Sequence, residues 1–281
     1  MKHLRFFSLG LLAAALGIGG TASAEDHGRA LVLGDSVAFA YIADAGFAYG
    51  NPENFVGFAN RLDDTFKNAA DAGCPGETTG SFLSATAPDN GCRAFRAHFP
   101  LHVAYASTQL DFATAYLKQH HEVRVVTITL GANDGFLLEE GCASQPDPTA
   151  CIEAGLPMVL ATVEHNMQTI LADLRATGYG GAIVITNYYS LDYSNAAATG
   201  LTQLLNKALE APAAAYGAVV ANLFTAFKTV ASAPPFGGNS CNAGLLNASV
   251  QNQLLCDVHP SQSGHQLIAN AIAHRLPPDH D

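Results

Sequence analysis

A serine that follows a short apolar run is the first feature of the sequence able to do chemistry. Residues 30–33 (Ala-Leu-Val-Leu) are typical of a buried strand, and Gly34-Asp35-Ser36 come directly after them. Because a glycine permits a tight turn, we expect Ser36 to be presented at the carboxyl end of that strand as a nucleophile. An ordinary polar turn is the alternative interpretation, because so short a motif of common residues also occurs by chance.

A second polar segment follows another strand-like run. Residues 123–130 are rich in β-branched side chains, and Gly131-Ala132-Asn133-Asp134 come next. This position is equivalent to that of Ser36, and the Asn133 amide can donate a hydrogen bond to an oxyanion that develops during attack on a carbonyl group. A simple Asn-Asp turn explains the segment equally well.

A histidine close to the carboxyl end of the chain has a carboxylate beside it. The segment Asp257-Val258-His259-Pro260 precedes a helical pattern. Histidine is the usual proton acceptor for a serine nucleophile, and Asp257 is near enough to bind the imidazole Nδ1 and fix its tautomer. Pro260 and Ser261 also suit a helix start, so a capping segment with an incidental histidine is the alternative.

A fourth segment, residues 74–79 (Cys-Pro-Gly-Glu-Thr-Thr), is a candidate loop of the same site. Gly76 can expose a backbone N–H that gives an oxyanion a second hydrogen bond, while Cys74 anchors the loop. A disulfide-tethered turn without a catalytic role is the alternative, and both interpretations can hold together.

The cysteines favour three disulfides over a metal site. The six are Cys74, Cys92, Cys142, Cys151, Cys241 and Cys256. Six cysteines allow 15 pairings, of which we favour pairing in chain order, 74–92, 142–151 and 241–256. A zinc site is not favoured because there is no C-x-x-C motif, and the adjacent pair His120-His121 fits a solvated helix end better than a ligand pair.

Strand-like and helical runs alternate along the chain and predict how these segments are positioned. The expected strands are 30–33, 123–130, 182–186 and 218–222. The expected helices are 55–66, 110–121, 158–176, 201–216 with a kink or early end at Pro212, and 264–276, with 142–157 as a disulfide-tied insertion. Such alternation predicts a parallel sheet covered by helices on both faces, with the active groups at the carboxyl ends of the strands.

Taken in order, the four segments resemble the four conserved blocks of the SGNH/GDSL hydrolases. The resemblance covers residues 30 to about 275, and the cysteines together with the segment 74–79 are similar to the exported bacterial lipase/esterase branch. It implies a flavodoxin-like α/β/α fold with a central parallel sheet, and neither a metal nor an organic cofactor.

The resemblance also implies roles for individual residues. Ser36 is the expected nucleophile and His259 its base, while Ser36 N–H, Gly76 N–H and the Asn133 side chain are the expected oxyanion donors. The family usually has Asp-x-x-His, but Cys256 stands at that aspartate position here and Asp257 follows one residue later. Either Asp257 or a backbone carbonyl is therefore expected to orient His259.

The amino-terminal residues predict export. Lys2 and Arg5 precede an apolar stretch that ends at Ala22-Ser23-Ala24, the pattern of a cleaved signal peptide over residues 1–24. We expect a single secreted or periplasmic domain over 25–281, monomeric and without a stable membrane anchor. Removing Lys2 and Arg5 takes the formal charge from −11 to −13, which disfavours nucleic acid as a partner because like charges repel.

The sequence says less about the substrate. A small-molecule or lipid ester is expected, with fatty-acyl esters first because of the resemblance and acetylated polysaccharide second. The absence of Trp weighs mildly against a carbohydrate site. A non-catalytic exported binding protein on the same scaffold is a third hypothesis. Aromatic side chains near the expected site either line an acyl pocket or belong to the core: Phe39, Tyr41, Phe47, Tyr49, Tyr188 and Tyr189.

Overall fold

A five-stranded parallel sheet forms the centre of the computed structural model. The structure describes residues 28–42, 57–62, 66, 69–248 and 256–276. The strands are β1 (Arg29–Gly34), β2 (Ala70–Asp71), β3 (Val123–Thr129), β4 (Ala182–Thr186) and β5 (Ala218–Ala221). Their order across the sheet is β2-β1-β3-β4-β5, and every neighbouring pair is parallel. A separate antiparallel pair is formed by β6 (Leu246–Ala248) and β7 (Cys256–Pro260).

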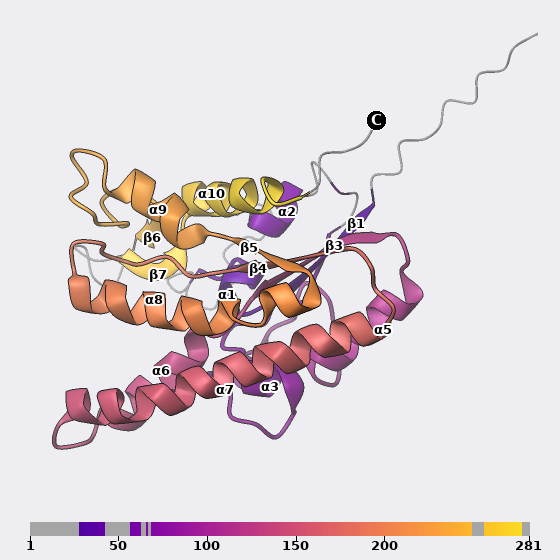
Figure 1. Ribbon diagram of the computed structural model, residues 1–281, viewed down its shortest axis with the longest axis horizontal. Coiled ribbons are helices and arrows are strands. Elements are labelled where there is room, and N and C mark those ends of the chain that lie inside the picture. Colours follow the sequence, from indigo (N-terminus) through magenta and orange to yellow (C-terminus); the bar gives the residue numbers. More distant parts are fainter. Residues whose placement is uncertain (1–27, 43–56, 63–65, 67–68, 249–255, 277–281) are drawn as a thin grey trace, which may run out of the picture.

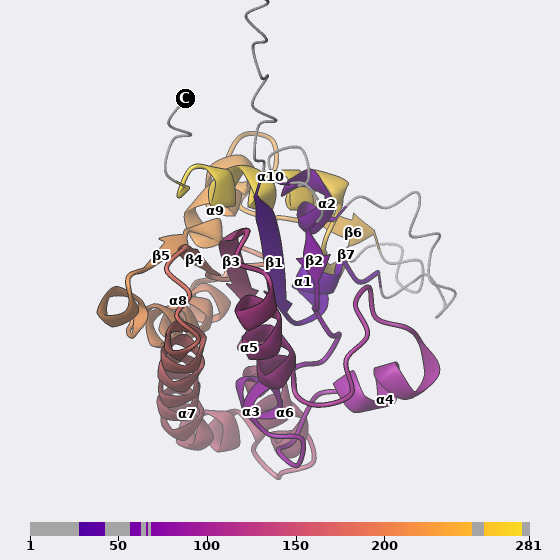
Figure 2. The ribbon, with the colours of Figure 1, turned by 90° about the vertical axis from the view of Figure 1, so that its right-hand side faces the viewer.

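Helices cover both faces of this sheet, which gives the expected α/β/α fold. The helices are α1 (Ser36–Phe39), α2 (Phe58–Leu62), α3 (Thr79–Leu83), α4 (Cys92–His98), α5 (Gln109–Gln119), α6 (Ala132–Cys142), α7 (Pro148–Ala176), α8 (Ala196–Glu210), the 3-10 helix η2 (Ala213–Tyr216), α9 (Leu223–Ala231) and α10 (Gln262–Ala273). Figures 1 and 2 show α2, α9 and α10 on one face and α5 and α7 on the other. Within the described residues, no helix is long and apolar enough to cross a bilayer.

The strand order explains where a site must form. The chain moves from β1 outward to β2, and from β3 in the opposite direction to β4 and β5. Right-handed connections then place the helices that follow these two neighbouring strands on opposite faces of the sheet. The loops after β1 and β3 separate at this point and leave a crevice at the carboxyl edge. Ser36 follows β1 and Asn133 follows β3, so the topology brings both to this crevice.

The three disulfides join the cysteines in chain order. They are Cys74–Cys92, Cys142–Cys151 and Cys241–Cys256, with Cα–Cα distances of 5.5, 5.6 and 5.6 Å. All six cysteines of the chain are therefore paired. Each bridge closes a short loop, which stabilises the fold mainly by restricting the unfolded chain.

The segment expected to be a disulfide-tied insertion, 142–157, is tied by the Cys142–Cys151 bridge and is largely helical. It contains the first turns of α7, which continues through Pro157 to Ala176. A proline inside a helix removes one N–H donor, here the bond to the Glu153 carbonyl, and both residues are solvent-exposed. Water can therefore replace the lost bond. The expected early end of the helix near Pro212 is confirmed, because α8 ends at Glu210. Phe55 lies outside the described residues.

Candidate active site

A strained turn between β1 and α1 presents Ser36. Gly34 has φ +137°, and a Cβ on it would lie 1.9 Å from the Thr129 carbonyl oxygen, so only glycine fits there. The Asp35 N–H donates to that same oxygen at 2.9 Å, and the Asp35 carboxylate caps α1 by accepting from Val37 N at 2.9 Å. Ser36 is therefore the first residue of a helix at the carboxyl edge of the sheet.

The Asp35 side chain is buried behind the serine. Only 1% of the residue is exposed, and its carboxylate accepts a hydrogen bond from the Tyr188 hydroxyl. Burial raises the pKa of Asp35 to about 6, although the hydrogen bond from Tyr188 opposes that rise. The motif aspartate thus fixes the turn from inside the protein.

The imidazole of His259 is held by the neighbouring carboxylate. Both Asp257 oxygens lie close to His259 Nδ1, at 2.9 and 2.8 Å. The two residues belong to β7, and in an extended chain residues i and i+2 point to the same side. The short Asp-x-His spacing therefore suits a strand. Contact with a carboxylate keeps the proton on Nδ1 and leaves Nε2 as the basic atom.

Two tyrosines support the histidine from other parts of the chain. The Tyr189 hydroxyl donates to the Val258 carbonyl at 2.7 Å, directly beside His259. The ring of Tyr41 meets the imidazole edge-on, with 5.1 Å between ring centroids. Cys256 is bonded to Cys241, so the position that the family usually gives to aspartate serves here as a covalent anchor.

The candidate oxyanion donors come from two neighbouring loops. Asn133 is the second residue of α6, and its Nδ2 donates to the Glu77 carbonyl oxygen at 3.0 Å. Gly76 has φ +87°, a left-handed conformation that favours glycine. Asp134 ties the loops together by accepting from both the N–H and the hydroxyl of Thr79, at 2.9 and 2.6 Å. The structure thus brings the segments containing Gly76 and Asn133 side by side.

A buried polar network lies beneath the Gly76 loop. Glu77 is 3% exposed, and its carboxyl group accepts from the Ser81 hydroxyl and from Gln109 Nε2, the latter at 3.2 Å. Burial raises the pKa of Glu77 to about 7, against the effect of these hydrogen bonds. Gln109 also pairs with both backbone groups of Gly34, at 2.6 and 3.0 Å, and so links this network to the turn that carries Ser36.

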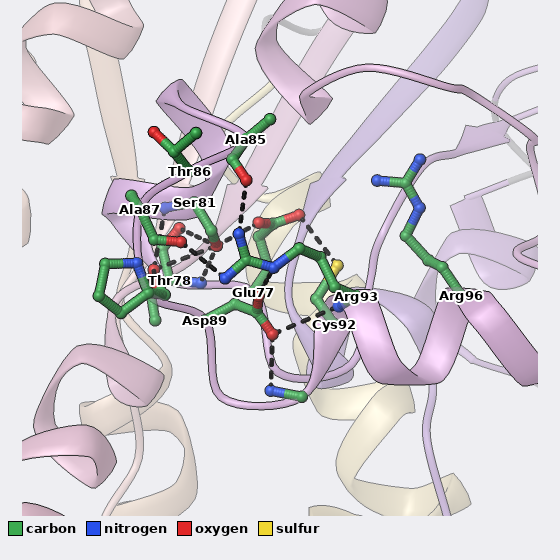
Figure 3. A network of polar contacts seen from close by, with 12 residues as sticks. Glu77, Thr78, Ser81, Ala85, Thr86, Ala87, Asp89, Cys92, Arg93 and Arg96 are labelled. Carbon is green, nitrogen blue, oxygen red and sulfur yellow. Dashed lines mark hydrogen bonds and ion pairs between the residues drawn. The ribbon is translucent and has the colours of Figure 1, made fainter.

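Figure 3 shows the Glu77 and Ser81 part of this network together with Arg93, which contacts the same loop. Arg93 donates to the carbonyls of Ala85 and Ala87 and forms an ion pair with Asp89. The sulfurs of Cys74 and Cys92 lie near the Glu77 carboxyl group, the one grouping of possible metal ligands among the described residues. Because the two sulfurs are joined to each other, they offer no thiolate to a metal.

The candidate nucleophile, base and oxyanion donors line one cavity of about 1010 Å³, and Asp257 lies behind His259 outside this lining. Ser36, Gly76, Asn133 and His259 lie in its wall. Most other lining side chains are apolar. Those on α4, α6, α7 and α8, together with Phe99 just after α4, are Phe95, Phe99, Phe136, Leu138, Ile152, Leu156, Val159, Leu160, Leu201 and Leu205. This arrangement places a serine, a carboxylate-held histidine and candidate amide donors in the wall of one largely apolar cavity.

The aromatic residues divide between cavity and core. Tyr41, Tyr188 and Tyr189 line the cavity, whereas Phe39 is 4% exposed and packs against Phe95 and His102, at 5.3 and 4.3 Å between centroids. Phe47 and Tyr49 lie outside the described residues. Sequence reasoning missed Asn90 and Gln109, since the contacts that give them importance join distant parts of the chain.

Comparison with known protein families identifies one match. Residues 32–267 match the model of the GDSL-like lipase/acylhydrolase family. No curated protein sequence matches significantly.

Solved structures share the fold at low sequence identity. Phospholipase A1 from Streptomyces albidoflavus is 16% identical over 88% of this chain and 99% of its own, with a TM-score of 0.55. The extracellular lipase of Streptomyces rimosus is 15% identical over the same shares, with a TM-score of 0.54. A variant of Axe2, an acetyl-xylooligosaccharide esterase from Geobacillus, is 14% identical over 90% of this chain and 97% of its own, with a TM-score of 0.52. The family match spans most of the sequence, and the chain belongs to the GDSL-like lipase/acylhydrolase family of carboxylic ester hydrolases.

Proposed function

We propose that this protein is an exported serine esterase or lipase that hydrolyses fatty-acyl esters through an acyl-enzyme. The observation that carries the proposal is the convergence of Ser36, His259 and Asn133 on one apolar cavity. A nucleophile, its base and a donor to the oxyanion are the groups that acyl transfer requires.

In the proposed reaction, His259 Nε2 takes the proton of the Ser36 hydroxyl as its oxygen attacks the ester carbonyl. The negative charge that develops on the carbonyl oxygen is held by the N–H groups of Ser36 and Gly76 and by Asn133 Nδ2. Asp257, at 2.8 Å from Nδ1, stabilises the imidazolium. Collapse expels the alcohol, which takes the proton from His259. Water, deprotonated by the same histidine, then releases the acid and restores the serine.

The lining of the cavity favours fatty-acyl esters over acetyl esters. The fold does not choose between them, because the neighbouring structures include a phospholipase A1 and an acetyl-xylooligosaccharide esterase. Leu156, Leu160 and Leu205 give a long acyl chain an apolar wall that an acetyl group does not need. Each buried methylene contributes roughly 0.8 kcal/mol, about fourfold in kcat/KM.

Export is supported by two independent observations. Residues 1–24 have the pattern of a signal peptide, and all six cysteines form disulfides, which persist in oxidising compartments. We therefore propose a secreted or periplasmic enzyme whose mature part is a single monomeric domain beginning at residue 25.

The test is hydrolysis of p-nitrophenyl acetate, butyrate, octanoate and palmitate by the mature protein. Ser36→Ala should lower kcat by at least about 10⁴-fold, whereas Ser232→Ala, at an exposed helix end, should not. We expect kcat/KM to rise from acetate to octanoate. A preference for acetate would replace the fatty-acyl assignment with an acetyl esterase. Turnover that survives Ser36→Ala would refute the site, and no turnover of any ester would favour a binding protein.

A further inference from the structure

Asn90 contacts both loops that carry the proposed oxyanion donors. It lies between α3 and α4, is half-buried and lines the cavity. Its backbone N–H donates to the Gly76 carbonyl oxygen at 2.8 Å, and its side-chain Nδ2 donates to Asn133 Oδ1 at 2.9 Å. One residue thus joins the segment of Gly76 to the side chain of Asn133, which is 43 positions away.

These contacts allow only one orientation of the Asn133 amide. The Glu77 carbonyl can only accept a hydrogen bond, so the NH₂ end of the amide must face it. The oxygen end of the Asn133 amide then faces Asn90, whose NH₂ group donates to it. The Glu77 contact uses one N–H of Asn133 Nδ2, and the second remains for a substrate oxygen. A reversed amide would place Oδ1 against the Glu77 carbonyl and beside the developing negative charge.

The same contacts set the position of Gly76 relative to Asn133. Gly76 and Glu77 are consecutive, so the bonds Asn90–Gly76, Asn90–Asn133 and Asn133–Glu77 close a ring. The ring is tight, because a Cβ on Gly76 would lie 2.2 Å from the Asn90 carbonyl oxygen. The Cys74–Cys92 disulfide bridges the loop just outside this ring.

We propose that Asn90 is a positioning residue of the oxyanion hole. Its side chain secures the Asn133 amide in the orientation that the Glu77 carbonyl requires, and its backbone N–H holds the Gly76 loop beside it, without being required to touch the reacting atoms. The inference rests on the proposed function, in which Asn133 and Gly76 stabilise the transition state. Because a preorganised donor acts mainly on the transition state, loss of Asn90 should lower kcat and leave KM nearly unchanged.

The test is a double-mutant cycle between positions 90 and 133. Removing one oxyanion donor typically costs about 10²–10³-fold in kcat, so Asn133→Ala should fall in that range. We expect kcat of Asn90→Ala to be about 10- to 100-fold lower than that of the wild type. This loss is smaller than that of Asn133→Ala, because the donor itself remains. Asn90→Asp keeps the shape but replaces the donor by an acceptor, and it should lose more than Asn90→Ala. When Asn133→Ala is already present, either substitution at position 90 should lower kcat further by less than about threefold.

The control is Asn166→Ala, which removes a hydrogen bond of 2.9 Å to Thr79 in the same region without reaching Asn133. It should leave kcat within about twofold, as expected when only a neighbouring contact is lost. Each kcat is divided by the fraction of active sites titrated with a serine-directed phosphonate, so partial unfolding does not imitate the effect. Asn90→Ser is the substitute if Asn90→Ala does not fold.

Two results would overturn the inference. One is wild-type kcat in both Asn90→Ala and Asn90→Asp. The other is an equal loss with and without the Asn133 side chain, which would mean that Asn90 acts by another route. Failure of the proposed function is a different outcome, because Ser36→Ala would then keep its activity whatever the variants at position 90 do.

Discussion

The carboxyl group of Glu77 is buried directly beneath the loop that carries Gly76, and it should make stability depend on pH. The residue is 3% exposed, and burial raises its pKa from 4.5 to about 7. The perturbation is Glu77→Gln, which keeps the shape and a neutral group for Ser81 and Gln109 to contact.

The direction of the pH dependence follows from the direction of the pKa shift. Since the folded-state pKa is above the ordinary one, the folded protein holds this proton more tightly than the unfolded chain does. The stability that the proton confers is complete below about pH 4.5 and is lost as the pH rises through about 7. A pKa of about 7 in place of 4.5 corresponds to about 3 kcal/mol in the free energy of unfolding. Glu77→Gln should not undergo this loss.

The measurement is urea unfolding of both proteins with intact disulfides between pH 4 and pH 8.5. Burial also raises the pKa values of Asp35 and Asp71 to about 6, but both proteins contain these groups, so the difference between them isolates Glu77. As the pH rises from 4 to 8.5, we expect the free energy of unfolding of Glu77→Gln to increase by about 3 kcal/mol relative to that of the wild type. A difference that stays constant with pH would refute the reasoning, because Glu77 would then not change its protonation in that interval.

Two further substitutions test the walls of the site. Tyr189→Phe removes the hydrogen bond of 2.7 Å to the Val258 carbonyl. We expect it to lower the free energy of unfolding by about 1 kcal/mol. It should also lower kcat while leaving the preference for acyl-chain length unchanged. Leu205→Trp should fill the α8 side of the cavity and lower the octanoate-to-acetate ratio of kcat/KM at least tenfold, while acetate hydrolysis stays within about threefold, because only the longer chain needs that space. An unchanged ratio would place the acyl chain elsewhere.

The chemistry-bearing segments could be located from the sequence because they stand at strand ends. The runs before Ser36 and Asn133 are buried strands, and their residue types and lengths identify them without knowledge of the partners. A parallel sheet then places both residues at one edge. The pairing of the cysteines in chain order also agrees with the structure, since each pair is close in sequence.

What the sequence could not predict depends on contacts between distant residues. No periodic pattern in the sequence indicates the hydrogen bond between Asn90 and Asn133. The pair Asn90-Gly91 is typical of an ordinary turn. The sequence left open what orients His259, because the answer depends on the extended conformation of β7, which puts Asp257 on the same side. The helical start of α7 was missed because Pro157 indicates a helix end, and its solvent-exposed position removes most of that penalty.

The three disulfides lie beside the segments of the candidate site and not within the central sheet. Cys74 stands two residues before Gly76, Cys142 ends the helix that begins beside Asn133, and Cys256 directly precedes Asp257. None of them joins two strands of the central sheet, whose apolar residues are already buried between two helical layers. A shift of about 1 Å in a donor or base can cost 10²-fold in rate, so the position of these segments matters for the proposed reaction. The disulfides therefore add covalent ties to segments that buried polar contacts already order, and their reduction should disturb the geometry of the candidate site as well as the stability of the fold.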